Sequence, residues 1–283
     1  MEYWIMLMKY KKNMNEVSIK LQGGMGNYMF QIAAAYAYGL KYNKKSFFTM
    51  NDAVLVHKNI SYYKENIFKK VNLLDSKKIN EKTIVYNEPG FNFSEIPEIK
   101  GNVYLNGYFQ SEKYFYEFKK EIIELFSFPQ EFINDLHTKT IKNYEIDLNN
   151  CNTCSIHVRR GDYLRYPDHH PTQNINYYLK AIKLMPKDSV FLIFSDDINW
   201  CKEFFPDIPE KFKFIDGNTD YEDLILMSLC KNNIICNSTF SWWAAWLNQN
   251  QDKKVIVPTN WFGKAYANNK TDDIFCENWI KLN

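Results

Sequence analysis

The sequence predicts an α/β protein in which each half of the chain is built around a parallel β-sheet. In the second half, short apolar runs alternate with amphipathic stretches, which is typical of strands joined by helices. In the first half, a strand-like run leads through several glycines into an apolar, helix-like stretch. Residues 147–153 between the halves are polar and break the helical pattern. We therefore expect a weakly ordered leader over residues 1–15 and two domains, over residues 16–150 and 151–283.

The first domain is expected to begin with a Rossmann-like strand, turn and helix. Residues 16–22 predict the strand, Gly23, Gly24 and Gly26 predict the turn, and the next residues are apolar at helical spacing. Glycines at this place let a ligand approach the helix N-terminus closely. The dinucleotide fingerprint requires a further glycine that this chain lacks, and Tyr28 lies in that region. Two alternatives stay open, a ligand-binding loop and a turn that simply requires glycine.

The rest of the first half carries weaker signals. Residues 46–99 give no clear assignment, because the apolar runs there are short and broken. Residues 103–109 predict a strand. We expect two helices after it, one over residues 111–126 with a serine cap and one over residues 129–144 that opens at a proline.

The second half predicts strands and helices in regular alternation. The strands are expected at residues 155–158, 190–194, 212–215, 234–236 and 255–257. The helices are expected near residues 175–185, 197–205, 220–230 and 240–248. Thr219 and Glu222 have the spacing of a capping box. Trp242 and Trp246 lie about one turn apart in the last helix and are expected to pack it against the sheet.

Unusual polar residues gather after the predicted strands of the second half. They occupy residues 157–162 after the first strand, 195–197 after the second and 237–241 after the fourth. In parallel sheets, ligands bind outside the carboxyl ends of the strands. Three polar loops at one edge of one sheet therefore predict a binding site.

Arg159 and Arg160 predict that the ligand is an anion. A guanidinium offers paired donors that fit phosphate or carboxylate oxygens. If the strand continues through Arg159, alternation puts Arg159 and Arg160 on opposite faces, with His157 beside Arg159. We therefore expect the two arginines to have different roles. The alternative is a structural ion-pair cluster in which Arg160 binds Asp162.

The helix predicted to open at residues 237–241 would add a second anion-binding element. Its N-terminus carries free backbone N–H groups and several hydroxyls, and the helix dipole favours negative charge there. A diphosphate held between this helix and an arginine fork needs no metal. The sequence holds neither a Walker lysine motif nor an Asp-x-Asp pair of the kind that binds a divalent cation under a nucleotide sugar.

Composition excludes several classes of protein. A net charge of +2 over 283 residues gives no strong field for nucleic acid. The six cysteines are scattered, and Cys151 and Cys154 lack a second ligand pair at zinc spacing, so we expect free thiols and no zinc. The sequence contains no secretory signal and no apolar run of about 18 residues, which predicts a cytoplasmic protein.

Five motifs match a known family in the right order along the chain. They are Gly23-Gly-Met-Gly-Asn27, Gly107-Tyr-Phe-Gln-Ser-Glu-Lys-Tyr114, His157-Val-Arg-Arg-Gly-Asp-Tyr163, Phe194-Ser-Asp-Asp197 and Asn237-Ser-Thr-Phe-Ser-Trp-Trp243. With these motifs the chain resembles the bacterial α-1,2-fucosyltransferases of glycosyltransferase family 11. The resemblance spans nearly the whole chain.

The resemblance implies an α/β fold of GT-B type, with two Rossmann-like domains that face each other across a cleft. The N-terminal domain would lie on the acceptor side, and the C-terminal domain would bind GDP-fucose. The implied reaction moves L-fucose from GDP-β-L-fucose, with inversion and without a metal or other cofactor, to the 2-hydroxyl of a terminal β-galactoside of a surface glycan. If a lipid carries that acceptor, as in O-antigen biosynthesis, the enzyme would act at the inner face of the membrane.

The resemblance also implies roles for catalytic residues. Arg159 would bind the β-phosphate and steady the leaving GDP, with Arg160 and Asp162 in support. Asn27 would reach the donor or the acceptor from its glycine loop. Candidates for the general base share the loop after residue 158, with Asp162 ahead of Asp168, His169 and His170.

Further residues are expected to bind the donor. Those facing guanine would be His157 and one of Asp196 and Asp197. Those seating the diphosphate would be Asn237, Ser238, Thr239 and Ser241, with Gly24 and Gly26 allowing close approach at the glycine loop. Family members usually have glutamine where this chain has Tyr28, a difference that bears on the acceptor.

Two other functions are compatible with parts of the sequence. A nicotinamide-dependent oxidoreductase would use the first glycine loop. A non-catalytic sugar-binding protein would use the abundant aromatic residues, which include 21 Phe, 20 Tyr and 7 Trp. The paired arginines argue against the second function, because a lectin site needs no phosphate seat.

Overall fold

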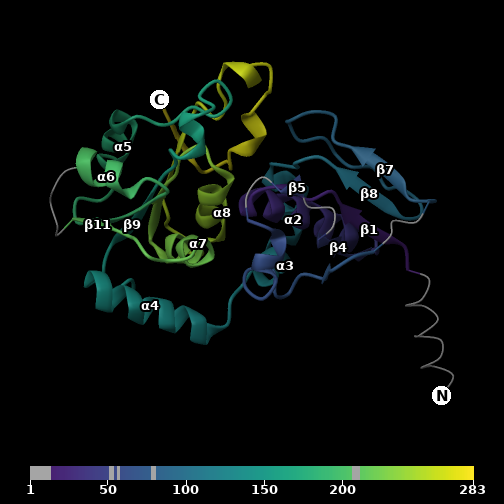
Figure 1. Cartoon of the computed structure of the whole chain (residues 1–283), viewed down its shortest axis with the longest axis horizontal. Helices are drawn as coiled ribbons and strands as arrows, with labels where there is room; N and C mark the ends of the chain where they lie inside the picture. The colour runs from purple at the N-terminus through teal and green to yellow at the C-terminus, as the bar shows by residue number, and fades with distance from the viewer. Residues whose placement is uncertain (1–13, 51–53, 56–57, 78–80, 206–210) are drawn as a thin grey trace. The chain divides into compact units, whose positions relative to one another are not determined.

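The computed structural model describes residues 14–50, 54–55, 58–77, 81–205 and 211–283, and it shows an α/β protein with parallel sheets (Figure 1). The chain divides into two compact units. The first holds residues 1–127 and 272–274, and the second holds residues 128–271 and 275–283. Of the leader expected over residues 1–15, all but the last two residues lie outside the described part of the chain. No helix in the described part is long and apolar enough to span a membrane.

The first unit is organised around a four-stranded parallel sheet. In spatial order its strands are β3 (Lys45–Ser46), β1 (Glu16–Ile19), β8 (Val103–Asn106) and β7 (Ile84–Asn87). Two further parallel pairs join β2 (Gln22–Gly23) to β5 (Val54–Leu55) and β4 (Phe48–Thr49) to β6 (Leu73–Leu74). The helix α2 (Met25–Lys41) follows the glycine turn and is buried along most of its length. The predicted succession of strand, turn and helix is confirmed.

Residues 46–99, which the sequence left unassigned, hold very short elements. They include two-residue strands and the 3-10 helix η2 (Ile60–Tyr63). The strand pairs join residues that lie far apart in the chain, such as Phe48 and Leu73. A strand of two residues shows no alternation, so the sequence pattern could not reveal it.

The helix expected to start at Ser111 is interrupted. Ser111 caps only a 3-10 turn, η3 (Glu112–Tyr114), and the α-helix α3 is limited to Lys119–Leu125. Contacts outside the segment compete with the helix, because the hydroxyl of Tyr114 lies 3.3 Å from the carboxylate of Glu88. Tertiary hydrogen bonding has therefore overridden the helical pattern.

The second unit holds a six-stranded parallel sheet. In spatial order its strands are β11 (Phe212–Phe214), β10 (Val190–Ser195), β9 (Thr153–Val158), β12 (Asn232–Ile234), β13 (Val255–Pro258) and β14 (Ile280–Leu282). Its connecting helices are α5 (Ile175–Ile182), α6 (Ile198–Phe204), α7 (Asp220–Leu229) and α8 (Thr239–Leu247). Every strand and helix that the sequence predicted in this half is confirmed, with small shifts at the ends. The strand β14 was not predicted, because it is short and largely exposed.

The core of the second unit surrounds β9, which is buried along its whole length. Polar side chains of this strand have partners inside the protein, since Ser155 Oγ accepts a hydrogen bond from Asn233 Nδ2 at 2.8 Å. Trp242 and Trp246 of α8 are buried and stack with their ring centroids 6.2 Å apart. These tryptophans are core residues, as expected, and Trp242 also packs against Trp279.

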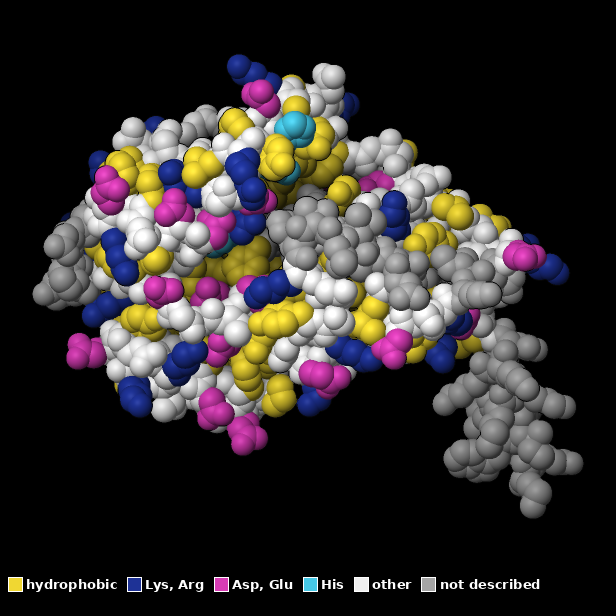
Figure 2. Space-filling model, in the orientation of Figure 1, with side chains coloured by type: hydrophobic (Ala, Val, Ile, Leu, Met, Phe, Trp, Pro, Cys, Tyr) yellow, Lys and Arg dark blue, Asp and Glu magenta, His cyan; other side chains and the backbone are white. Residues whose placement is uncertain are grey.

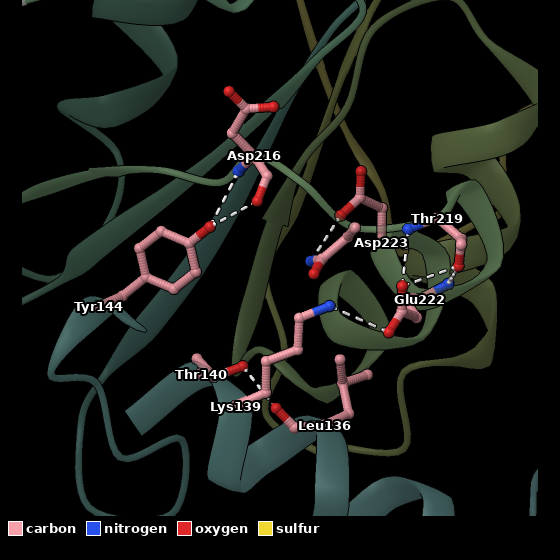
Figure 3. A network of polar contacts seen from close by, with 9 residues as sticks. Leu136, Lys139, Thr140, Tyr144, Asp216, Thr219, Glu222 and Asp223 are labelled. Atoms are coloured by element: carbon pink, nitrogen blue, oxygen red, sulfur yellow. Dashed lines mark hydrogen bonds and ion pairs between the residues drawn. The ribbon is translucent and has the colours of Figure 1, made fainter. Parts of the chain in front are cut away.

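The helix α4 (Gln130–Tyr144) begins where predicted but belongs to the second unit. Figure 3 shows the contacts that attach it near the start of α7. Lys139 forms an ion pair with Glu222 at 3.1 Å, and the Tyr144 hydroxyl donates to the carbonyl and accepts from the N–H of Asp216. The division between the units therefore lies before α4, earlier in the chain than the sequence suggested.

Thr219→Ala should destabilise the second unit by about 1 kcal/mol, because Thr219 is the N-cap of α7 and forms a capping box with Glu222. The free energy of unfolding is measured by urea denaturation. Thr138→Ala is the control, because that exposed hydroxyl bonds only to a carbonyl of its own helix, and its expected effect is below about 0.5 kcal/mol. Equal losses in the two variants would contradict the role of the capping box.

Candidate active site

The carboxyl ends of β9, β10 and β12 lie at one edge of the sheet and bring the polar loops of the second unit together. These strands pair in parallel, with Ser195 opposite Val158 at the ends of β10 and β9. The loops that follow are tied to one another, since the Tyr163 hydroxyl donates to the carbonyl of Asn237 at 2.9 Å. The arrangement brings the three loops together at the place where parallel sheets bind ligands.

Arg159, directly after β9, is held by two carboxylates. Its Nη2 lies 2.7 Å from Asp162 Oδ1, and its Nη1 lies 3.1 Å from Asp196 Oδ2. Burial opposes the charged guanidinium, but Asp196 and Asp162 outweigh burial and raise the pKa of Arg159. The side chain keeps 28% of its surface exposed. Arg159 is therefore fixed in direction and still accessible to a ligand.

Arg160 has a different environment, as expected, although β9 ends at Val158 and the strand alternation does not reach the arginines. Its Nε lies 3.0 Å from Asp197 Oδ2, and its guanidinium lies 4.2 Å from the centre of the Trp200 ring. The side chain is only 17% exposed. The alternative in which Arg160 binds Asp162 is wrong, because Asp162 pairs with Arg159 instead. Arg160 thus fixes the loop to α6 through charge and a cation–π contact.

Asp196 connects the two arginines. Its Oδ1 accepts the backbone N–H of Arg160 at 2.8 Å while its Oδ2 binds the side chain of Arg159. The carboxylate lies so close to Gly161 that a Cβ added there would be 2.6 Å from Oδ2. A glycine at position 161 is therefore required by this approach, and the loop could not carry a larger residue without moving Asp196.

Asp196 and Asp197, one of which was expected to face guanine, both bind groups within the protein. Asp197 caps α6 by accepting the N–H of Trp200 at 3.2 Å and also binds Arg160. Asp196 binds both arginines. Both carboxylates hold the loop of residues 159–162 in place, and the guanine contact expected from one of them stays a prediction.

His157 lies inside the protein and not on its surface. It is 5% exposed, and its Nδ1 lies 3.2 Å from the sulfur of Cys236. Its ring packs 5.1 Å from Phe240. Burial, with a smaller effect of Arg159, lowers the pKa of His157 to about 3, so the ring is neutral. The expectation that His157 faces a guanine base does not match this buried position.

Asn237 and Ser241 are also enclosed, although both were expected to seat a diphosphate. The amide of Asn237 is 2% exposed and donates to the carbonyls of Pro171 and Trp261, each at 3.0 Å. Its Oδ1 accepts a hydrogen bond from Gln173. Ser241 is fully buried. The Asn237 side chain therefore joins three loops and has no free donor for a phosphate.

The N-terminus of α8 keeps fewer ligand-binding groups than expected. Ser238 is its N-cap residue but makes no capping hydrogen bond with its side chain. Ser238 is nearly buried, whereas Thr239 is half-buried. The groups left for an anion are the first backbone N–H groups of α8 and the hydroxyl of Thr239.

The glycine loop of the first unit is shaped by one close approach. Gly23 has φ +90°, and an added Cβ would lie 2.3 Å from Asn27 Nδ2. Asn27 Oδ1 accepts a hydrogen bond from Gln110 at 2.8 Å, and Gly24 is the N-cap residue of α2. Gly23 is therefore needed for the turn itself. The roles expected for Gly24, Gly26 and Asn27 in binding a ligand stay predictions.

Tyr28 points into the core of the first unit. It is fully buried, and its hydroxyl has no hydrogen-bond partner among the described residues. The position at which family members usually have glutamine is thus an internal one here. Any effect on the acceptor would have to act through the packing of α2.

The possible general bases differ in their freedom. Asp162 is occupied by Arg159. His170 stacks on Tyr163 with ring centroids 4.9 Å apart and an interplanar angle of 21°. Burial lowers the pKa of His170 despite the nearby carboxylate of Asp162, so the ring is neutral at physiological pH. Asp168 is exposed and His169 is half-buried.

Trp200, which packs against Arg160, is a site residue that the sequence did not reveal. Asp223 is a further carboxyl whose pKa the sequence did not show to be unusual. Asp223 lies in the first turn of α7, where its Oδ1 accepts a hydrogen bond from Asn218 at 3.0 Å. Burial, assisted by Glu222 and Asp220, raises the pKa of Asp223 to about 7. The acidic run at the start of α7 was the signal available in the sequence.

Comparison with known proteins assigns the family. The family described as glycosyl transferase family 11 matches residues 1–283. The chain belongs to this family. It is 32% identical to the O-antigen biosynthesis glycosyltransferase WbnK of Escherichia coli, over 93% of this chain and 99% of that protein. It is 31% identical to an alpha-1,2-colitosyltransferase of Escherichia coli, over 95% of this chain and 99% of that protein.

Among solved structures, this family 11 glycosyltransferase is similar to the α-1,6-fucosyltransferase NodZ from Bradyrhizobium. The TM-score is 0.53 at 13% identity, over 82% of this chain and 92% of that chain. The likeness concerns the fold, which is of GT-B type as the sequence predicted. Family membership also removes the nicotinamide-dependent oxidoreductase and the non-catalytic lectin from consideration.

The family 11 chain shows no cluster suited to a metal in its described part. Within residues 14–50, 54–55, 58–77, 81–205 and 211–283, no three His, Cys, Asp or Glu side chains lie close enough to hold an ion. The metal independence expected from the sequence stays a prediction. The cysteines are free thiols, as expected.

Asp223→Asn should make the unfolding free energy less dependent on pH. The folded state raises the pKa of Asp223 from 3.8 to about 7, so it holds the proton more tightly than the unfolded state. The resulting stabilisation is present below about pH 4 and is lost as the pH rises through 7. The wild type should lose at most about 1.4 kcal/mol per pH unit from this group. Urea denaturation between pH 4 and 8 measures the slope.

The control for this experiment is Asp252→Asn, because Asp252 is exposed. This variant should keep the slope of the wild type. If Asp223→Asn and Asp252→Asn showed the same dependence on pH, Asp223 would not be a group that titrates near neutrality.

Proposed function

We propose that the protein is a galactoside α-1,2-fucosyltransferase. It would move L-fucose from GDP-β-L-fucose to the 2-hydroxyl of a terminal β-galactoside in a surface glycan of the O-antigen kind. The observation that carries the proposal is Arg159, fixed by two carboxylates at the carboxyl edge of the sheet and still partly exposed. A fixed and accessible guanidinium is suited to an anion with paired oxygens, such as the pyrophosphate of a nucleotide sugar.

The reaction would break the bond between the anomeric carbon and the β-phosphate oxygen. The acceptor 2-oxygen forms the new bond from the opposite face, and the electron pair of the broken bond goes to the diphosphate. Negative charge therefore grows on GDP in the transition state, and preorganised donors are most effective there. The side chain of Arg159 and the first N–H groups of α8 would supply these donors, so no metal is required.

The proton of the acceptor hydroxyl would be taken by His170. The ring is neutral, because burial lowers its pKa, and it stacks on Tyr163 close to the arginine loop. Asp162 suits this role less well, since its carboxylate is bound to Arg159 and protonation would unpair the arginine. His170 therefore replaces Asp162 as the first candidate for the general base.

The donor sugar has one competing candidate. A relative that is 31% identical is named as an alpha-1,2-colitosyltransferase. L-Colitose is L-fucose without its 3-hydroxyl, so the two donors share the nucleotide, the leaving group and the site of attack. The proposed chemistry holds for either donor, and the choice depends on the groups around the sugar 3-position.

The proposed reaction is tested by incubating the enzyme with GDP-fucose or GDP-colitose and with lactose, N-acetyllactosamine or a type 1 disaccharide. Release of GDP measures turnover, and linkage analysis of the product identifies the bond. Transfer of fucose to the 2-hydroxyl of galactose supports the proposal. Efficient transfer of colitose with no transfer of fucose would reassign the donor, and a product linked elsewhere would reassign the acceptor hydroxyl.

Arg159→Lys should lower kcat by about 10² to 10³-fold and leave the fold intact, because lysine keeps the charge but loses the paired donors. GDP release under saturating donor and acceptor measures the effect. Arg165→Lys is the matched control, since Arg165 lies in the same loop and is exposed. It should turn over at the rate of the wild type. A fully active Arg159→Lys enzyme would remove Arg159 from the transition-state role.

A further inference from the structure

Two loops at the carboxyl edge of the second unit form an aromatic surface that the donor site does not use. The loop after β9 contributes Tyr163, Tyr166, His169 and His170, and the loop after β13 contributes Phe262 and Tyr266. We call these residues the aromatic cluster. His170 packs against Phe262 and Tyr266 with ring centroids 5.7 and 6.1 Å apart, and His169 packs against Tyr266 at 5.1 Å.

Large apolar side chains in these loops face solvent. Tyr166 is 58% exposed and Tyr266 is 39% exposed. Leu164, two residues before Tyr166, is 51% exposed. In Figure 2, histidine lies within a group of hydrophobic side chains on this face of the molecule. Exposed apolar side chains that lie together, in contrast to scattered ones, commonly mark a binding surface.

The two loops are locked to each other, so the surface is preformed. Gly263 N–H donates to the carbonyl of His169 at 3.0 Å, and Ala265 N–H donates to the carbonyl of Asp168 at 2.7 Å. A Cβ at Gly263 would lie 2.4 Å from the Asp168 oxygen, so only glycine permits this approach. Preformed surfaces bind with a smaller entropic cost than mobile loops.

The aromatic cluster is continuous with the proposed donor site. The ring of Tyr163 lies 5.7 Å from the guanidinium of Arg159 and 4.9 Å from the ring of His170. The chain of contacts therefore runs from the residue proposed to bind the diphosphate, through Tyr163 and His170, to Tyr266.

We propose that the aromatic cluster binds the acceptor sugar, through stacking of Tyr166 and Tyr266 against the apolar face of a β-galactoside. This inference rests on the proposed function. A pyranose presents C–H groups on one face and hydroxyls at its rim, and tyrosine and histidine offer an apolar ring with a polar tip. The position next to His170 would place the acceptor hydroxyl near the proposed base. The second unit would then contribute to both substrates.

The experiment compares steady-state kinetics of Tyr166→Ala and Tyr266→Ala with the wild type, using GDP-fucose and lactose. Each variant should raise the KM for lactose by about tenfold, equivalent to about 1.4 kcal/mol of binding. The Kd for GDP, measured by calorimetry, should not change. Tyr166→Phe keeps the ring and should restore the KM, which a loss of folding would not allow.

Leu184→Ala is the control for removal of an exposed apolar side chain. Leu184 is 43% exposed, and its carbonyl accepts a hydrogen bond from Lys254, which precedes β13 at the opposite edge of the sheet. This variant should have the KM of the wild type. An unchanged lactose KM in both tyrosine variants would overturn the inference. An equal rise of the lactose KM in Leu184→Ala would also overturn it.

Binding of the sugar is also measured without turnover, by saturation-transfer NMR of methyl β-galactopyranoside and lactose. The wild type should transfer saturation to the galactose protons. The double variant that combines Tyr166→Ala and Tyr266→Ala should not. Absence of transfer in the wild type would overturn the inference. If the wild type binds galactoside through these tyrosines but releases no GDP from GDP-fucose or GDP-colitose, the proposed function fails while the sugar site stands.

Discussion

The site depends on one constraint, the fixing of Arg159 by carboxylates from two different strand ends. Asp162 comes from the same loop, and Asp196 comes from the end of the neighbouring strand. An arginine side chain has many rotamers, and a ligand that had to immobilise it would bind more weakly. Here the parallel register of β9 and β10 brings Asp196 to the arginine before any ligand arrives. Preorganised charge is usually the largest contribution to the stabilisation of a leaving diphosphate.

Other residues at the carboxyl edge of the sheet hold the loop of Arg159 in place. Arg160 is held by Asp197 and Trp200, so the loop cannot swing away from α6. Gly161 leaves room for Asp196. Asn237 joins its own loop to the loop that holds Pro171 by a hydrogen bond. His157 stays neutral in the interior and adds no charge that would repel the guanidinium. In this chain, the residues that can contact a substrate are thus distinct from the residues that hold them in place.

The sequence predicted the second unit well and its site only in outline. The strand β10 shows an apolar run, and the helix α7 shows a capping box, so these sequence patterns located them. The sequence also predicted that Arg159 and Arg160 would have different roles, although the strand ends at Val158, before either arginine. It could not predict which carboxylate pairs with which arginine, because that depends on the register of two separate strands. Nor could it show that His157 and Asn237 are enclosed.

The first unit was harder to predict for a physical reason. Several of its strands have two residues, and their partners lie far along the chain, as in the pair β4 and β6. The hydroxyl of Tyr114 similarly binds Glu88, a contact with no local sequence signal. The motif around Gly23 was nevertheless visible, because the close approach of Asn27 makes glycine necessary at that turn.

The most direct test of the account is the affinity of GDP for Asp196→Asn, measured by calorimetry. The substitution removes one negative charge beside Arg159 while leaving an oxygen for the N–H of Arg160. If Asp196 orients the guanidinium for the diphosphate, GDP should bind about tenfold more weakly in the variant, equivalent to about 1.4 kcal/mol. If the carboxylate merely neutralises a structural arginine, its removal would free positive charge and GDP would bind as tightly or more tightly. That second result would contradict the account.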